Sequence, residues 1–161
     1  MKKIIFVRHG RAEEQGYDFG DFQRSLTAKG KSICRLMAGK MKETEKDPGR
    51  FITSPAFRAL ETALIFAEEY RIEPENITLD SNLYYNMDLR YLKKLLSGLD
   101  NSISSIILFG HNPSFTHLAG QLSKDGIDFM QKTSVAGISF KTDDWNDIRE
   151  GAGKLDYFLR P

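Results

Sequence analysis

The chain has 161 residues, of which 40% are apolar and 28% charged, a composition typical of a globular protein with a sizeable core. Its 23 basic and 22 acidic side chains give a net charge of +1. This balance argues against general attraction to nucleic acid or to an anionic membrane, so any bound anion must be held by local charges. We expect one domain spanning residues 1–161.

A single cysteine, Cys34, excludes an internal disulfide framework and zinc sites built from several cysteines. Because Cys34 lies in an amphipathic segment, we interpret it as a buried thiol. The apolar run Ile4–Val7 near the amino terminus is too short for a signal peptide or a membrane span. We therefore expect a cytoplasmic protein.

Short apolar runs alternate with helical patterns along the chain. Helices are predicted where apolar residues recur at three- and four-residue spacing or where capping residues stand. The predicted strands are Ile4–Val7, Phe51–Ile52, Ile77–Leu79, Ile106–Phe109, Ile138–Lys141 and Leu155–Leu159; the predicted helices are Thr27–Met41, Ala56–Tyr70, Asp88–Ser97 and Pro113–Leu122. The segment Lys141–Gly153 is interpreted as a solvated loop between two strands. Such alternation predicts an α/β fold, a three-layer α/β/α sandwich with a mainly parallel central sheet.

Polar residues suited to phosphate follow three of the predicted strands. They are Arg8-His9-Gly10, Thr53-Ser54-Pro55 with Arg58 nearby, and Gly110-His111-Asn112-Pro113. In a parallel sheet the carboxyl ends of the strands meet at one edge, where ligands bind. Arginine matches phosphate oxygens with a planar fork of donors, and glycine lets a ligand approach the backbone closely. The three segments together predict a phosphate site.

Each candidate residue also has a simpler explanation. A histidine at a strand end such as His9 can be a nucleophile, a general base, a metal ligand or a hydrogen-bonded core residue. His117 lies inside the helix after Pro113, six positions beyond His111, so the two do not share a helical face. A zinc site is disfavoured, because the histidines have no ligand spacing of the His-Glu-x-x-His kind. Arg58 could pair with Glu61, and Thr62 is expected on the same helical side as Arg58. Other polar residues are interpreted as follows: Ser54 as a helix cap, Arg24 as a loop arginine, and Asp18 and Asp21 as a solvated loop face.

The motifs Arg8-His9-Gly10, Ser54-Pro55-x-x-Arg58-x-x-x-Thr62 and Gly110-His111, in this order, resemble the histidine phosphatase superfamily with its phosphoglycerate-mutase-like fold. Their spacing is similar to that of the small SixA-type branch of phosphohistidine phosphatases. The segment Arg24-Ser25-Leu26-Thr27-x-x-Gly30 matches the same branch, apart from serine at position 25 where proline is usual. The resemblance covers essentially the whole chain.

The resemblance implies that His9 is a nucleophile that carries a phosphoryl group covalently. Arg8, Arg58 and His111 would surround the phosphoryl oxygens, and Asn112 and Arg24 would add substrate contacts. The implied enzyme needs no metal and no cofactor, because positive side chains supply the electrostatics. Its substrate would be a phosphorylated protein carrying phosphohistidine or a small phosphate compound, with no nucleic-acid or membrane partner.

One departure from the family concerns the glutamate that protonates the leaving group in larger members. The corresponding stretch Asn82–Asp88 contains no glutamate, and its Asp88 can instead cap a helix; the nearest other carboxylate is Asp80. A missing general acid slows alkyl ester cleavage by about two to four powers of ten, and phosphohistidine less. Asp88, Asp21 or solvent could supply the proton. A small-molecule phosphomonoesterase and a non-catalytic phosphate-binding module stay as alternatives.

Overall fold

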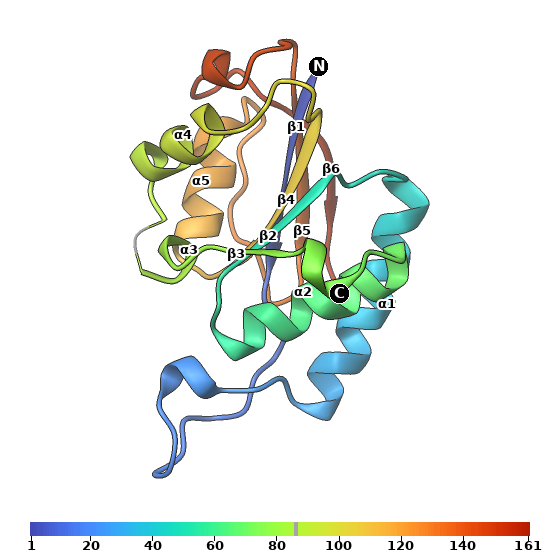
Figure 1. Cartoon of the computed structure of the whole chain (residues 1–161), viewed down its shortest axis with the longest axis vertical. Helices are drawn as coiled ribbons and strands as arrows, with labels where there is room; N and C mark the ends of the chain where they lie inside the picture. Colours follow the sequence, from blue (N-terminus) through green and yellow to red (C-terminus); the bar gives the residue numbers. More distant parts are fainter. Residues whose placement is uncertain (86) are drawn as a thin grey trace.

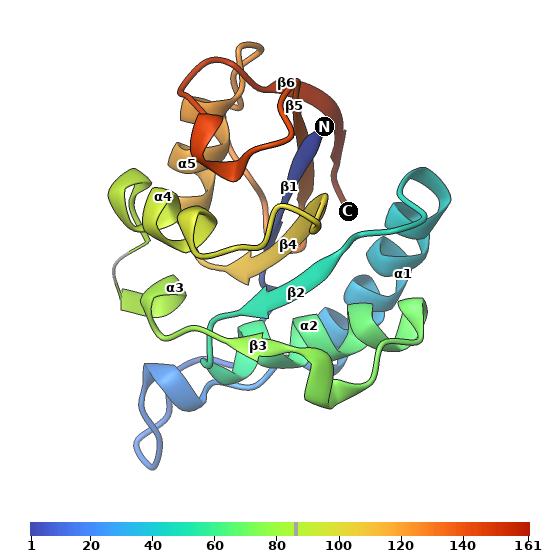
Figure 2. The ribbon, with the colours of Figure 1, turned by 45° about the horizontal axis from the view of Figure 1, so that its top comes forward.

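A computed structural model describes residues 1–85 and 87–161, and its centre is a six-stranded sheet in the order β3-β2-β4-β1-β5-β6 (Figures 1 and 2). The strands are β1 Lys2–Arg8, β2 Arg50–Thr53, β3 Thr78–Leu79, β4 Ser105–Gly110, β5 Val135–Phe140 and β6 Lys154–Leu159. Four of them, β3, β2, β4 and β1, pair in parallel, and β5 runs antiparallel to both β1 and β6. The prediction of a mainly parallel sheet in an α/β fold is confirmed.

Two of the helices begin at a residue whose side chain caps them. Thr27 accepts a hydrogen bond from the Gly30 amide at 2.9 Å ahead of α1 (Ala28–Thr44), and Asp88 accepts one from the Tyr91 amide at 2.8 Å ahead of α4 (Leu89–Ser97). The helices are α1 Ala28–Thr44, α2 Phe57–Tyr70, α3 Asn82–Tyr85, α4 Leu89–Ser97 and α5 Ser114–Leu122, with 3₁₀ turns η1 Asp21–Gln23, η2 Pro74–Asn76 and η3 Trp145–Asp147. Within the described ranges, no helix combines the length and the apolar character needed to cross a membrane.

Two hydrophobic cores lie on opposite faces of the sheet, because successive side chains of a strand point to opposite sides. In β1, Ile4 and Phe6 belong to the core beneath α4 and α5, whereas Ile5 and Val7 belong to the core beneath α1 and α2. Figure 1 shows the resulting layers, with α4 and α5 to one side of the sheet and α1 and α2 to the other. The predicted three-layer arrangement is therefore present.

One detail of the sequence analysis is wrong. The segment Lys141–Gly153 joins β5 to β6 as expected, but it is not a purely solvated loop. Its Trp145 is only 1% exposed and donates from Nε1 to the Ile103 carbonyl at 3.0 Å. In α1 and α2, Leu36 and Leu64 are exposed, whereas Met37, Met41 and Phe66 are buried. Apolar periodicity located both helices, and only some of its apolar positions face the core.

Candidate active site

The three predicted strand ends lie side by side, because β2, β4 and β1 are consecutive in the sheet (Figure 2). The His9 amide donates to the Gly110 carbonyl at 3.0 Å, and the Ser54 amide donates to the Phe109 carbonyl at 2.9 Å. Regular parallel pairing thus continues just past the strands. It brings His9, Ser54 and His111 together at one edge of the sheet.

His9 is 7% exposed, and a hydrogen bond to the backbone orients its ring. Nδ1 lies 2.7 Å from the Gly10 carbonyl oxygen, which can only accept, so Nδ1 carries the proton. In a neutral ring the lone pair is then on Nε2, which lies 3.4 Å from Nε of Arg58. Burial, the neighbouring His111 ring, Arg58 and Arg8 lower the pKa of His9 to about 3. The unprotonated Nε2 is therefore the prevailing form at neutral pH.

Gly10 lets this turn form close to the helices. Its amide donates to Oγ1 of Thr62 at 3.0 Å, and a Cβ added to Gly10 would lie 2.6 Å from Sγ of Cys34. Thr62 in turn donates to the Arg58 carbonyl at 2.6 Å, on the site side of α2 as expected. Cys34 is buried, as predicted, and burial raises the pKa of its thiol. The residues behind His9 are thus closely packed.

The His111 ring lies 5.0 Å from the His9 ring, measured between centroids. Its Nε2 is 2.8 Å from Oγ of Ser54, and that hydroxyl also accepts from the Ala56 amide at 3.2 Å. Ser54 therefore bridges His111 to the chain just before α2 rather than capping the helix, whose N-cap is Ala56. Burial, together with Arg58, lowers the pKa of His111 to about 4. Nδ1 of His111 is buried and has no hydrogen-bond partner among the described residues, and it can donate to a bound anion when Ser54 donates to Nε2.

Two arginines flank the histidines. Arg8 donates from Nη1 to the Met130 carbonyl at 2.9 Å, and its guanidinium lies 5.5 Å from the Phe129 ring centroid. Its Nε is buried and finds no partner in the described part of the chain. Arg58 is buried on α2 and reaches the His9 ring through Nε. Two buried nitrogens without a partner among the described residues, Nε of Arg8 and Nδ1 of His111, together with Arg58 are suited to bind the oxygens of a tetrahedral anion.

Asp21 binds the terminal nitrogens of the Arg58 guanidinium. The interpretation of Asp21 as part of a solvated loop face is therefore wrong. Nη1 of Arg58 donates to the Asp21 carbonyl at 2.6 Å and Nη2 to its carboxylate at 2.9 Å. Arg24 and Tyr84 also donate to this carboxylate, at 2.9 and 2.8 Å. Partial burial opposes ionisation, but these hydrogen bonds outweigh it and lower the pKa of Asp21. The alternative pairing of Arg58 with Glu61 is not formed, since Glu61 accepts from the Leu26 amide at 2.6 Å.

The remaining candidates make contacts within the protein. Asn112 donates to the Met130 carbonyl at 3.0 Å and accepts from the Thr116 hydroxyl at 3.0 Å. Arg24 binds Asp21, and its Nε donates to the Glu13 carbonyl at 2.6 Å. Asn112 and Arg24 therefore hold neighbouring segments of the chain in place around the site. Asp88 caps α4, as the sequence analysis considered. Of the stretch Asn82–Asp88, Asn86 lies outside the described residues.

Tyr84 is the residue that sequence reasoning missed. Its ring contacts His111 edge-on, with 5.4 Å between centroids, and the Arg58 guanidinium lies 6.0 Å from its centroid. Tyr84 belongs to α3, a single turn without a detectable apolar period. One signal could have pointed to Tyr84. It lies in the stretch Asn82–Asp88, which carries a glutamate in larger family members.

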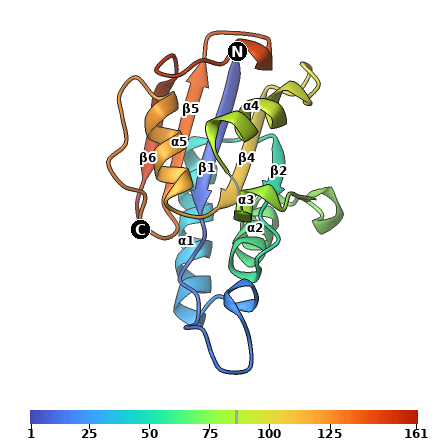
Figure 3. The same ribbon diagram turned by 90° about the vertical axis from the view of Figure 1, so that its left-hand side faces the viewer.

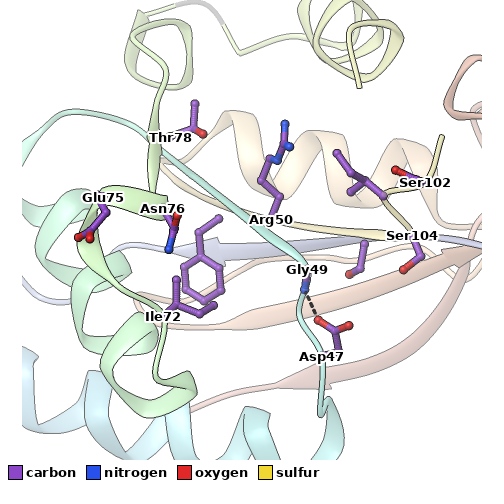
Figure 4. A pocket seen from close by; sticks show the side chains of 12 residues that line it. Asp47, Gly49, Arg50, Ile72, Glu75, Asn76, Thr78, Ser102 and Ser104 are labelled. Atoms are coloured by element: carbon purple, nitrogen blue, oxygen red, sulfur yellow. Dashed lines mark hydrogen bonds between the residues drawn. The ribbon is translucent and has the colours of Figure 1, made fainter. Parts of the chain in front are cut away.

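Two other features, His117 and a hollow, lie outside the site. His117 is exposed on α5, and the described residues contain no group of three His, Cys, Asp or Glu that could hold a metal ion. A hollow of about 770 Å³ lies at the amino ends of β2 and β4, beside Arg50, Asp47 and Glu75 (Figure 4). This hollow is at the opposite end of the strands from His9. The hollow is lined by both basic and acidic side chains and is separate from the site around His9.

Comparison with solved structures gives matches over nearly the whole chain. A phosphohistidine phosphatase SixA of Agrobacterium tumefaciens, described as such provisionally, is 19% identical with a TM-score of 0.81, covering 99% of this chain and 98% of its own. A protein histidine phosphatase SixA complexed with tungstate is 21% identical with the same TM-score, covering 98% and 96%. A mycobacterial glucosyl-3-phosphoglycerate phosphatase is 15% identical with a TM-score of 0.65, covering 96% and 97%. At these identities the matches show a shared fold.

Comparison of the sequence with known proteins and families gives a family match. No curated protein matches the chain. The family model for the histidine phosphatase superfamily (branch 1) matches residues 4–83, a range that contains both His9 and Arg58. The motif resemblance, the family match and the shared fold agree, and the chain therefore belongs to branch 1 of the histidine phosphatase superfamily, as a phosphatase of that family.

Proposed function

We propose that the protein is a phosphohistidine phosphatase that acts through a covalent phosphoryl group on Nε2 of His9. The observation that carries the proposal is the state of the His9 ring. Its Nδ1 is committed to the Gly10 carbonyl, its Nε2 lone pair is free of a proton at neutral pH, and Arg58 lies beside that nitrogen. A neutral, oriented imidazole next to cations is a suitable nucleophile for phosphorus.

In the first step the Nε2 lone pair attacks phosphorus and forms an N–P bond. The P–N bond to the leaving imidazole breaks in line, its electron pair goes to the leaving nitrogen, and solvent supplies a proton there. Charge on the phosphoryl oxygens is met by the guanidinium groups of Arg8 and Arg58 and by the Nδ1–H of His111. Such preorganised donors are the largest contribution to many phosphoryl transfers.

In the second step water attacks the phosphorus of phospho-His9. An O–P bond forms, the P–Nε2 bond breaks with its electron pair returning to Nε2, and the water proton passes to solvent. Inorganic phosphate leaves and the neutral ring is restored. The hydrogen bond from Nδ1 to the Gly10 carbonyl keeps the ring oriented in both steps.

The carboxylates around the site favour a phosphoramidate substrate over an alkyl ester. Asp21 accepts three hydrogen bonds and is ionised, so it holds no proton to donate at neutral pH. Asp88 is engaged as the cap of α4. An alkoxide leaving group would lack an acid, whereas imidazole takes its proton from water readily. A small-molecule phosphomonoesterase is the second candidate, because a glucosyl-3-phosphoglycerate phosphatase shares the fold.

Rapid quenching tests the proposal. Wild-type protein mixed with a ³²P-labelled phosphohistidine protein should yield an acid-labile, base-stable phosphoenzyme within one turnover. The matched control is His9→Asn, whose amide can keep the hydrogen bond to Gly10 while removing Nε2. A label that persists in His9→Asn would contradict the nucleophile assignment. Clearly faster hydrolysis of an alkyl phosphate than of phosphohistidine would favour the phosphomonoesterase, and phosphate binding without turnover would favour a binding module.

A further inference from the structure

We infer that Asp21 is a positioning residue that fixes the guanidinium of Arg58 while its negative charge opposes the anion held beside Arg58. The inference rests on the proposed function, because the reaction that Asp21 would assist is the proposed phosphoryl transfer to His9. It gives Asp21, in the segment between β1 and α1, a part in the site that the motifs do not name. Figure 3 shows this segment extending beyond the carboxyl end of β1, next to the start of α2.

Arg58 is held at both ends of its guanidinium. Nε faces Nε2 of His9 at 3.4 Å, and the two terminal nitrogens donate to the backbone and the carboxylate of Asp21 at 2.6 and 2.9 Å. A long arginine side chain has many rotamers, and a charge-assisted pair of bonds on its outer edge selects one of them. Contacts on the outer edge leave the remaining hydrogens of the guanidinium available for phosphoryl oxygens.

Asp21 is itself fixed, although its side chain is 41% exposed. Arg24 donates to one carboxylate oxygen at 2.9 Å, and the Tyr84 hydroxyl donates to the other at 2.8 Å. The turn that carries Asp21 is closed by Gln23, whose side chain accepts from the Gly20 amide at 3.0 Å. Since Tyr84 also packs against His111, the carboxylate links both sides of the site. The carboxylate thus accepts from its own turn and from two further elements, α2 and α3, more contacts than a side chain facing only solvent would make.

The negative charge of Asp21 affects anion binding in a way that its hydrogen bonds alone would not. The site places two guanidinium groups, those of Arg8 and Arg58, beside neutral histidines, and Asp21 offsets one of the two positive charges. An asparagine in its place could still accept from Arg58, but through a weaker bond between neutral and charged groups. Loss of the carboxylate should therefore strengthen binding of an anion and, by loosening Arg58, slow transfer of the phosphoryl group. A residue that only supports the fold would weaken both.

The test compares Asp21→Asn with Asp18→Asn, a matched control on the same exposed segment. Tungstate binding is measured by calorimetry, and phosphoenzyme formation from phosphoramidate is measured by rapid quench. For Asp21→Asn we expect a tungstate Kd lower by about two- to fivefold, the scale of a half-exposed charge interaction. We expect phosphorylation slower by about tenfold or more, because the clamp is less well placed. Asp18→Asn should change neither quantity by more than about twofold.

A double-mutant cycle shows whether Asp21 acts through Arg58. In an Arg58→Ala background, Asp21→Asn should change the phosphorylation rate by less than about twofold, because the group it positions is gone. The inference is overturned if Asp21→Asn weakens tungstate binding, leaves both quantities unchanged, or slows phosphorylation equally with and without Arg58. If wild-type protein binds tungstate but forms no phosphoenzyme, the proposed function fails. The tungstate comparison then decides the inference by itself.

Discussion

Acidification should destabilise this protein through its buried neutral histidines, and His9 makes the clearest case. The pKa of His9 is about 3 in the folded state, against an ordinary value of 6.5. The unfolded state therefore binds more protons between these values, so the free energy of unfolding falls as pH falls from about 6.5 toward 3. Between pH 7 and pH 5 the unfolded ring takes up most of one proton and the folded ring takes up none. This difference costs about 2 kcal/mol for His9.

The assay is urea unfolding at several pH values between 7 and 5, with wild type compared with His9→Asn. The variant cannot protonate at position 9, so it should lose about 2 kcal/mol less stability than wild type over this range. Other groups titrate in both proteins and cancel in the difference. Proton NMR gives a direct second measurement, because the chain has only 3 histidines and single variants assign their resonances.

The reasoning would be refuted by equal pH dependence of unfolding in wild type and His9→Asn. It would also be refuted by a His9 resonance that titrates near pH 6.5 in the folded protein. Either result would mean that His9 titrates in the folded protein near its ordinary pKa of 6.5, with about one quarter of it protonated at pH 7. Burial and the neighbouring cations would then not be what keeps the ring neutral, although the Nε2 lone pair would still be the major form at neutral pH.

Three further predictions test other parts of the site. Arg58→Ala should slow phosphoenzyme formation by about a hundredfold or more, as for removal of one transition-state charge clamp, and near wild-type rates in rapid quench would remove Arg58 from the site. Asp88→Ala should cost about 1 kcal/mol in urea unfolding through loss of the α4 cap, with turnover unchanged; a large drop in turnover would instead identify Asp88 as an acid. Gly10→Ala should cost about 1–3 kcal/mol, because its Cβ meets Sγ of Cys34 at 2.6 Å, and Cys34→Ala should restore part of that loss; no recovery would contradict the steric explanation.

The elements of the fold could be predicted because their signals are local. The apolar runs of β1 and β4 identify buried strands, and the capping residues Thr27 and Asp88 mark where α1 and α4 begin. The faces of the helices were less predictable. Phe66 of α2 is buried while Leu64 is exposed, because adjacent apolar residues of a helix cannot all lie on the one side that faces the sheet.

By itself, the sequence determined which residues meet at the strand ends. His9, Ser54 and His111 each follow a strand, and parallel pairing of three neighbouring strands brings such residues to one edge whatever the loops do. Only the tertiary structure decided what orients them. Asp21 lies 37 positions from Arg58 and 63 from Tyr84, and the segments of Asp21 and Tyr84 have no regular period, so no local pattern reports these contacts. Their association depends on how two loops pack beyond the sheet, which is a property of the folded chain as a whole.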